Sequence, residues 1–187
     1  GQAFLSFGGI FSEPEIPFTE LAGTVGWQVL AWPRPGQPLR LALDIDATRL
    51  ANADAAIHAK ARYVADQTGH DGQLDVIAGL ERGQARRVHR YLPQHLPQEV
   101  RDWVRQAFES GQLEQVQARV KGRLKAFPYQ RADEVDAGEF TLGGRFRDVL
   151  LRFAPDWPTL QQAGGQFGFD RAKLRVTGER AEVGRSR

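Results

Sequence analysis

The sequence predicts a β-dominated α+β fold, in which a curved antiparallel sheet of long strands packs against two short helices. Three observations support this prediction. Long stretches alternate apolar and polar residues, glycine- and proline-rich turns separate these stretches, and only two segments have helical spacing. A chain of 187 residues is long enough for one domain with a real core. We expect a single domain over residues 1–180 and a polar, disordered tail over residues 181–187.

The N-terminal half of the chain reads as a series of strands. Ala3–Phe11 is typical of a short strand, and the two prolines of Ser12–Pro17 predict an extended connection after it. The segment around Ala51–Ala65 also suits a helix because of its alanines, but the neighbouring alternation favours a strand. The strands expected after the connection are Thr24–Trp32, Leu39–Ile45, Ala55–Val64 and Gln73–Glu81.

The spacing of apolar residues changes after Gly83. It predicts a first helix over Ala85–Leu92 and a second over Pro97–Ser110, with proline placed in the first turn of the second helix. The simplest role for these helices is to cover one end of the sheet and bury Trp103 and Phe108.

The stretch Leu113–Phe127 alternates apolar and basic residues over an unusual length. At about 3.3 Å per residue a strand of this length extends roughly 50 Å. Such a strand indicates a broad, strongly curved sheet. Further strands are expected at Gly138–Leu142, Arg147–Ala154, Ala163–Phe169 and Lys173–Thr177, in an antiparallel meander whose turns are Gly143-Gly144, Asp156–Pro158 and Asp170-Arg171.

The residues that catalysis and metal binding require do not form recognised patterns. The chain has no cysteine, and its four histidines lack metal-ligand spacing, so we predict no metal site, no cofactor and no enzymatic activity. The serines lack a nucleophile motif. Asp44, Asp46 and Asp54 are expected on a solvated strand face and a loop. A net charge of +2 does not indicate a nucleic-acid partner.

The apolar strand faces are the strongest candidate for function, and two interpretations of them remain open. A second layer could seal them into an ordinary core, or an open curved sheet could leave an apolar channel that holds acyl chains. The residues expected to hold acyl chains are Leu39, Leu41, Leu43, Leu74, Val76, Val116, Val120 and Leu124. The basic residues expected on the rim or outer face are Arg119, Lys121, Arg123 and Lys125.

The order of several motifs resembles the AsmA-like envelope proteins of the YhdP type. The resemblance covers roughly residues 11–176. The motifs that carry it are Phe11–Phe18, Leu21–Trp27, Arg90–Pro93, Trp103–Phe108, Gly122–Leu124, Phe127–Tyr129, Gly138–Phe140 and Asp156–Pro158.

This resemblance implies a segment of a Gram-negative inner-membrane protein, located in the periplasm, that moves phospholipid towards the outer membrane through a long β-groove. It implies no catalytic residues. The implied partners are phospholipid acyl chains and neighbouring segments of the same membrane-anchored parent chain, with no specific nucleic acid. The alternative is a structural or protein-interaction module of the cell envelope that has a fully buried core and no lipid ligand.

Overall fold

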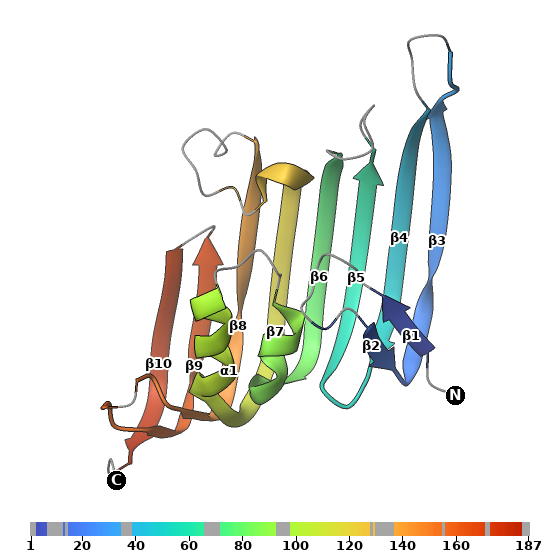
Figure 1. The fold of residues 1–187 in the computed structure, drawn as a ribbon. Helices are drawn as coiled ribbons and strands as arrows, with labels where there is room; N and C mark the ends of the chain where they lie inside the picture. Colours follow the sequence, from blue (N-terminus) through green and yellow to red (C-terminus); the bar gives the residue numbers. More distant parts are fainter. Residues whose placement is uncertain are drawn as a thin grey trace.

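The main element of the fold is an open antiparallel sheet of eight strands, each paired with the next along the chain (Figure 1). The computed structural model describes residues 3–6, 13, 15–34, 39–65, 72–92, 98–127, 129, 137–154, 156–170 and 173–184. The strands of the sheet are β3 (Glu20–Ala31), β4 (Arg40–Ala51), β5 (Ala55–Val64), β6 (Gln73–Gln84), β7 (Phe108–Arg123), β8 (Gly138–Leu151), β9 (Leu160–Asp170) and β10 (Lys173–Val183).

A small set of elements lies in front of one end of this sheet in Figure 1. It consists of the two-stranded sheet β1 (Ala3–Ser6) and β2 (Glu15–Phe18), the 3₁₀ helix η1 (Ala85–Tyr91) and the helix α1 (Gln98–Ala107). A second 3₁₀ turn, η2 (Leu124–Ala126), follows β7. We call the end beneath η1, α1, β1 and β2 the covered end.

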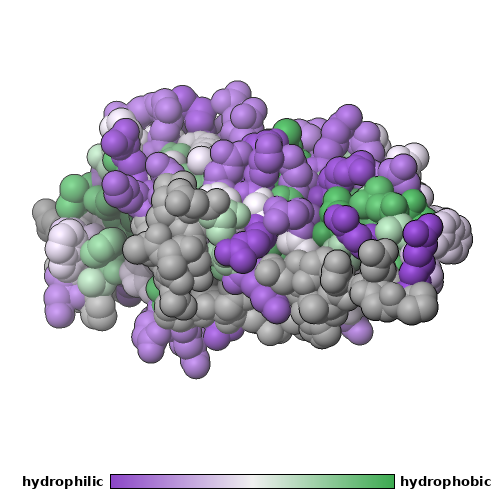
Figure 2. Space-filling view, turned by 90° about the horizontal axis from the view of Figure 1, so that it is seen from above, coloured by the Kyte–Doolittle hydropathy of each residue, from purple (hydrophilic) through white to green (hydrophobic). Residues whose placement is uncertain are grey.

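The two faces of the sheet differ in chemistry because side chains alternate along each strand. The register aligns Ala61 of β5 with Val76 of β6 and Val120 of β7. One residue away in each strand, Arg62, Asp75 and Lys121 are aligned on the opposite face. We call these the apolar face and the outer face. Seen from above, hydrophilic residues line one long side of the molecule and hydrophobic residues gather towards its two ends (Figure 2).

Bulges bend the sheet. Every neighbouring pair of strands except β6 and β7 contains a shift in register. At three of these bulges a non-glycine residue has positive φ: Gln115 (52°), Asp148 (54°) and Gln162 (48°). Because a bulge increases local twist and bends its strand, these irregularities account for the curvature that the sequence predicted.

The fully buried core is small. Most buried hydrophobic residues among those described are alanines, and the largest fully buried side chains are Tyr129, Ile16 and Val149. Beneath the helices, Val149 packs with Ala85 and Ala163, and the partly buried hydrophobic residues around them are Phe108, Leu113, Phe146, Leu151 and Leu160. The Val149 cluster therefore forms a core at the covered end, while Tyr129 is buried at the opposite end of the sheet.

At the covered end, a polar network links the β4–β5 turn to β2 and η1. Asn52 accepts hydrogen bonds from the backbone N–H groups of Asp54 and Ala55, both at 2.9 Å. Its Nδ2 group donates to the carbonyl of Pro17 in β2 at 3.0 Å and to the hydroxyl of Tyr91 at 3.1 Å. These contacts hold β2 and η1 against the sheet.

The structure confirms the β-dominated fold and the curved antiparallel sheet, and it corrects several boundaries. The segment predicted as an extended connection, Ser12–Pro17, is partly a strand, because Glu15–Phe18 forms β2. The first helix is a 3₁₀ helix, and the second ends at Ala107. The long strand ends at Arg123, so Leu124 and Lys125 lie in η2. Strand β10 continues to Val183, into the expected tail.

The predicted turn at Gly143-Gly144 is wrong. Both glycines lie inside β8, which runs without a break from Gly138 to Leu151. The segments predicted as two strands are therefore one long strand. Part of the predicted strand Ala3–Phe11 lies outside the described residues.

Replacing Tyr129 by phenylalanine should stabilise the fold. The Tyr129 side chain is fully buried, and its hydroxyl has no hydrogen-bond partner among the residues that the structure describes. Because an unpaired buried polar group costs roughly 1–3 kcal/mol, we expect Tyr129→Phe to raise the free energy of unfolding by about 1 kcal/mol in urea denaturation. A loss of stability would show that the hydroxyl has a partner in solution.

The same variant should change the response to alkaline pH. Burial raises the pKa of Tyr129 in the folded protein. As pH rises past the unfolded value of about 10, the unfolded chain loses the phenolic proton first, so the wild-type protein loses stability. Tyr129→Phe should weaken this alkaline loss, which urea titrations at pH 8 and pH 11 would measure.

Candidate functional site

The apolar face forms rows of hydrophobic side chains that run across the strands. In one row Leu43 of β4 lies opposite Tyr63 of β5, which lies opposite Leu74 of β6. The next row towards the covered end contains Val25, Ile45, Ala61, Val76, Val120 and Phe140. A third row contains Ala47, Ala59, Ala78, Ala118, Leu142, Phe169 and Leu174. The apolar face thus extends across the whole sheet.

Much of this face is not sealed by other parts of the described structure. Trp27 is 77% exposed and Val25 is 60% exposed at the β3 side, while Leu174 is 52% exposed at the β10 side. Between these edges, side chains such as Ile45, Val76 and Val120 are half-buried. A closed sandwich would bury such residues against a second layer. The structure instead has an apolar face that is open beyond the covered end.

Most of the residues predicted to hold acyl chains share this face. Six lie within the strands and on the same side of the sheet: Leu41, Leu43, Leu74, Val76, Val116 and Val120. Leu39 immediately precedes β4 and is 40% exposed. Leu124 does not join the rows as a strand residue, because it lies in η2, where it is 43% exposed.

The sequence reasoning missed the aromatic residues of the face. Trp27, Tyr63, Phe140 and Phe169 lie in the same rows as the predicted aliphatic residues. The sequence contains a signal for these aromatic residues, because each alternates with polar or small neighbours at period two. Extending the alternation to β3, β5, β8 and β9 would have found them.

An aromatic cluster limits the apolar face at the end of β7 and β8 away from the helices. Phe127 packs edge-on against Phe140, with ring centroids 5.2 Å apart, and against Tyr129 at 6.0 Å. The Tyr129 ring lies so close to Gly138 that a Cβ atom there would be 2.5 Å from it. The face is therefore bounded by these rings at one end and by α1 and η1 at the other.

The predicted basic residues do not line the apolar face. Arg119, Lys121 and Arg123 alternate with the apolar residues of β7 and lie on the outer face. Arg119 forms ion pairs with Asp75 at 3.2 Å and with Glu139 at 3.1 Å. Lys121 and Arg123 are exposed, and Lys125 lies in η2. Of the four predicted residues, only Arg123 and Lys125, at and just after the end of β7, can form part of a basic rim.

A second, smaller apolar hollow lies near the ends of β8, β9 and β10. It has a volume of about 280 Å³ and is lined by Leu151, Phe153, Trp157, Pro158, Leu160 and Val183. Trp103 of α1 contacts one of these lining residues: its indole N–H donates to the carbonyl of Phe153 at 2.9 Å, and its ring packs edge-on against the Phe153 ring. The buried cluster around Val149 lies next to this hollow and shares Leu151 and Leu160 with it.

Polar groups suited to catalysis or metal binding do not converge on the apolar face. Within the part of the chain that the structure describes, no group of three or more histidine, aspartate or glutamate side chains is arranged to hold a metal ion. Asp44 and Asp46 pair with Arg62 and Lys60 on the outer face. Among the described residues, no helix combines the length and apolar character needed to cross a bilayer.

An open antiparallel sheet with one broad, partly exposed apolar face defines a β-groove protein. Comparison with protein families identifies the group: residues 1–186 match the family described as YhdP protein, and the chain belongs to the YhdP family. Membership of this family indicates a protein of the cell envelope. No curated protein and no solved structure matches the chain significantly.

Proposed function

We propose that the apolar face binds the acyl chains of phospholipid as one segment of a lipid conduit between the inner and outer membranes. The observation that carries this proposal is the open apolar face, whose side chains stay half-buried or exposed beyond the covered end. Each methylene that such a face removes from water contributes roughly 0.8 kcal/mol to binding, and this contribution requires no specific polar contacts. Membership of the YhdP family supports the same function.

The boundaries of the face favour one direction for the bound chain. Along the strands, the path is limited by Phe127 and Tyr129 at one end and by the helices at the other. Across the strands, the rows of apolar residues continue from β3 to β10 with open edges on both sides. We therefore place the acyl chains across the strands, in line with the rows.

Under this proposal the lipid headgroup stays in water at the border of the apolar face, and the basic rim forms one part of that border at the end of β7. Lys125 lies in η2 and Arg123 ends β7, both exposed. Exposed cations attract anionic headgroups weakly and in a salt-dependent way. The protein would act in the periplasm of a Gram-negative cell as part of a membrane-anchored parent chain, with neighbouring segments of that chain as partners at the sheet edges.

The decisive experiment replaces a half-buried valine at the centre of the face with a charged residue. Native mass spectrometry of the purified protein, loaded from vesicles of phosphatidylethanolamine and phosphatidylglycerol, should detect bound phospholipid. Val120→Asp should abolish this binding, because a carboxylate there would have to lose its hydration against an acyl chain. Circular dichroism would establish that the variant folds.

A matched control lies three residues away on the same strand. Gln117 is exposed on the outer face of β7, so Gln117→Asp adds the same charge away from the proposed site. We expect this variant to bind phospholipid like the wild type. Absence of bound lipid in the wild-type protein would overturn the proposal, as would equal losses in the two variants.

The second candidate function is a structural or protein-interaction module of the envelope that binds no lipid. The compact cluster around Val149, together with the Asn52 network, favours it, because both are features of a rigid domain. It predicts that Val120→Asp alters stability or partner binding and that no lipid copurifies with the wild-type protein.

A further inference from the structure

The hairpin formed by β3 and β4 extends beyond the end of the neighbouring strand β5 (Figure 1). The last residue pair between β4 and β5 is Ala42 with Val64, whereas β3 and β4 stay paired up to Ala31 and Arg40. The end of this hairpin therefore projects from the sheet. We call the described residues with large side chains at this end the hairpin tip: Leu30, Trp32, Arg34, Leu39 and Arg40.

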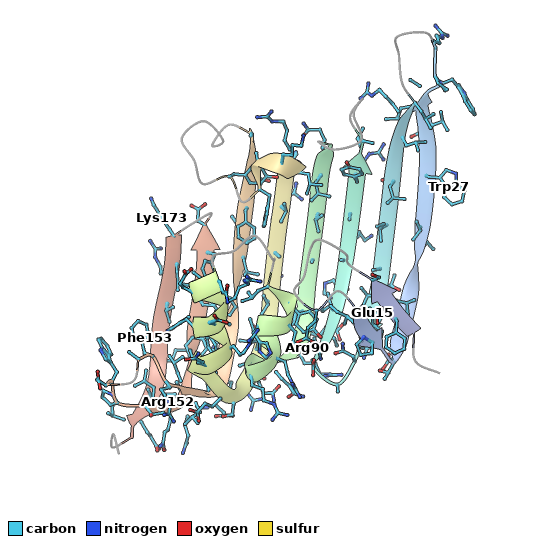
Figure 3. The ribbon with its side chains drawn as sticks, viewed as in Figure 1. Glu15, Trp27, Arg90, Arg152, Phe153 and Lys173 are labelled. Carbon is cyan, nitrogen blue, oxygen red and sulfur yellow. The ribbon has the colours of Figure 1, made fainter. Side chains whose placement is uncertain are left out.

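The hairpin tip presents large apolar side chains to solvent and differs from the lateral edge of β3. Trp32 is 73% exposed, and Leu30 and Leu39 are each 40% exposed. Trp27 lies on the lateral edge, as Figure 3 shows, where a neighbouring segment of the parent chain would extend the sheet. The connection between the two arms of the hairpin instead has proline at positions 33, 35 and 38. Because proline has no backbone N–H, an added strand would find few hydrogen-bond donors along the tip, so extension of the sheet provides no partner for it.

The charge of the hairpin tip is positive and unneutralised. Arg34 and Arg40 are exposed, and residues 21–43 contain no other charged residue. On the neighbouring strand, Arg62 pairs with Asp44 at 2.9 Å. In contrast, Arg34 and Arg40 form no ion pair within the part of the chain that the structure describes. The tip thus combines apolar side chains with two free cations, which complement an anionic surface.

We infer that the hairpin tip inserts into the headgroup layer of an anionic phospholipid bilayer. Tryptophan is enriched in this layer because its ring is apolar and its indole N–H can reach water or a headgroup. Arginine attracts the anionic headgroups. The prolines reduce the number of backbone N–H groups that insertion would leave unpaired. This surface is separate from the proposed acyl-chain site, and the inference does not rest on lipid binding there.

The test is flotation of the purified protein with vesicles of phosphatidylglycerol and phosphatidylethanolamine. The wild type should float with these vesicles and much less with vesicles of phosphatidylcholine alone. Trp32→Ala should weaken binding roughly tenfold, because less apolar area enters the bilayer. Arg34→Gln/Arg40→Gln should weaken it about 30-fold, because two cations near the anionic surface are lost.

Matched controls lie at exposed positions away from the hairpin tip. Trp157, near the small apolar hollow, is 60% exposed, and Trp157→Ala removes an equal aromatic side chain. Lys173 and Arg175 are exposed on β10, and Lys173→Gln/Arg175→Gln removes an equal charge. Both controls should bind the vesicles like the wild type. Circular dichroism would establish that all variants fold.

Val120→Asp separates this inference from the proposed function. It places a charge in the acyl-chain site and leaves the hairpin tip intact, so this variant should still float with the vesicles. A wild-type protein that does not bind the vesicles would overturn the inference, as would equal binding of the tip variants and their matched controls. Loss of flotation in Val120→Asp without loss in the tip variants would assign vesicle binding to the apolar face and would also overturn it.

Discussion

Arg90→Met should lower the free energy of unfolding by about 3 kcal/mol, because it leaves a buried carboxylate without its closest partner. Arg90 is labelled in Figure 3. Its guanidinium lies 2.5 Å from Asp54, whose side chain is 9% exposed, and 2.7 Å from Glu13. After the substitution, the one ion pair that Asp54 retains with a described residue is the longer one with Arg87 at 3.5 Å. Urea denaturation followed by circular dichroism would measure the change.

The control for this prediction lies on the same 3₁₀ helix. Arg86 is exposed, and its guanidinium donates a hydrogen bond to Gln84 at 3.0 Å. Arg86→Met removes an equal charge and should change stability by no more than about 0.5 kcal/mol. The double variant Arg90→Met/Asp54→Met should recover most of the loss, since it removes both buried charges. If the two single variants are equally stable, the ion pair does not hold the covered end.

The alternation of residues predicted the strands and their faces well, because period two depends only on the local chain. Leu43, Val76 and Val120 were expected on a shared apolar face, and the register places them there. The alternation likewise separated Arg119, Lys121 and Arg123 from the apolar residues of β7, and these three share the outer face. In a meander, neighbours in sequence are neighbours in space, so local patterns determine most of the sheet.

What the sequence could not predict depends on contacts between distant parts of the chain. Asp54 was expected in a solvated loop, yet it is buried because Arg90, 36 residues later, folds over it. The stop of β7 at Arg123 was also missed, since the alternation continues through Leu124 while the backbone turns into η2. Bulges have no sequence signal comparable to the alternation, because a single extra residue changes the period only locally.

Gly143 and Gly144 illustrate the same limit. A glycine pair is typical of a turn when only the local sequence is considered. In the structure, Gly144 is required by its neighbour across the sheet: a Cβ atom there would lie 2.6 Å from Cγ2 and 2.9 Å from Cα of Val116 in β7. The glycine thus allows β8 to approach the bulge that begins at Gln115, which no local pattern reveals.

Gly144→Val should therefore destabilise the protein by about 2–3 kcal/mol, because the new side chain collides with the backbone of β7 as well as with the Val116 side chain. The shift that relieves the collision would separate β7 from β8 at the centre of the apolar face. Thermal and urea denaturation would measure the loss of stability. Lipid binding measured in parallel should fall as well, if the apolar face is the binding site.

Gly143→Val is the matched control, and it should stabilise the protein. Its Cβ atom would project from the other face of β8, where the nearest atoms are the carbonyl oxygen of Phe167 at 3.4 Å and the Cα atom of Gly168 at 3.9 Å. Because this space is open and valine favours extended backbone, we expect a gain of roughly 0.5 kcal/mol. Equal losses at both positions would mean that the glycine pair is needed for its backbone conformation. Opposite signs would mean that packing against Val116 alone requires a glycine in this strand.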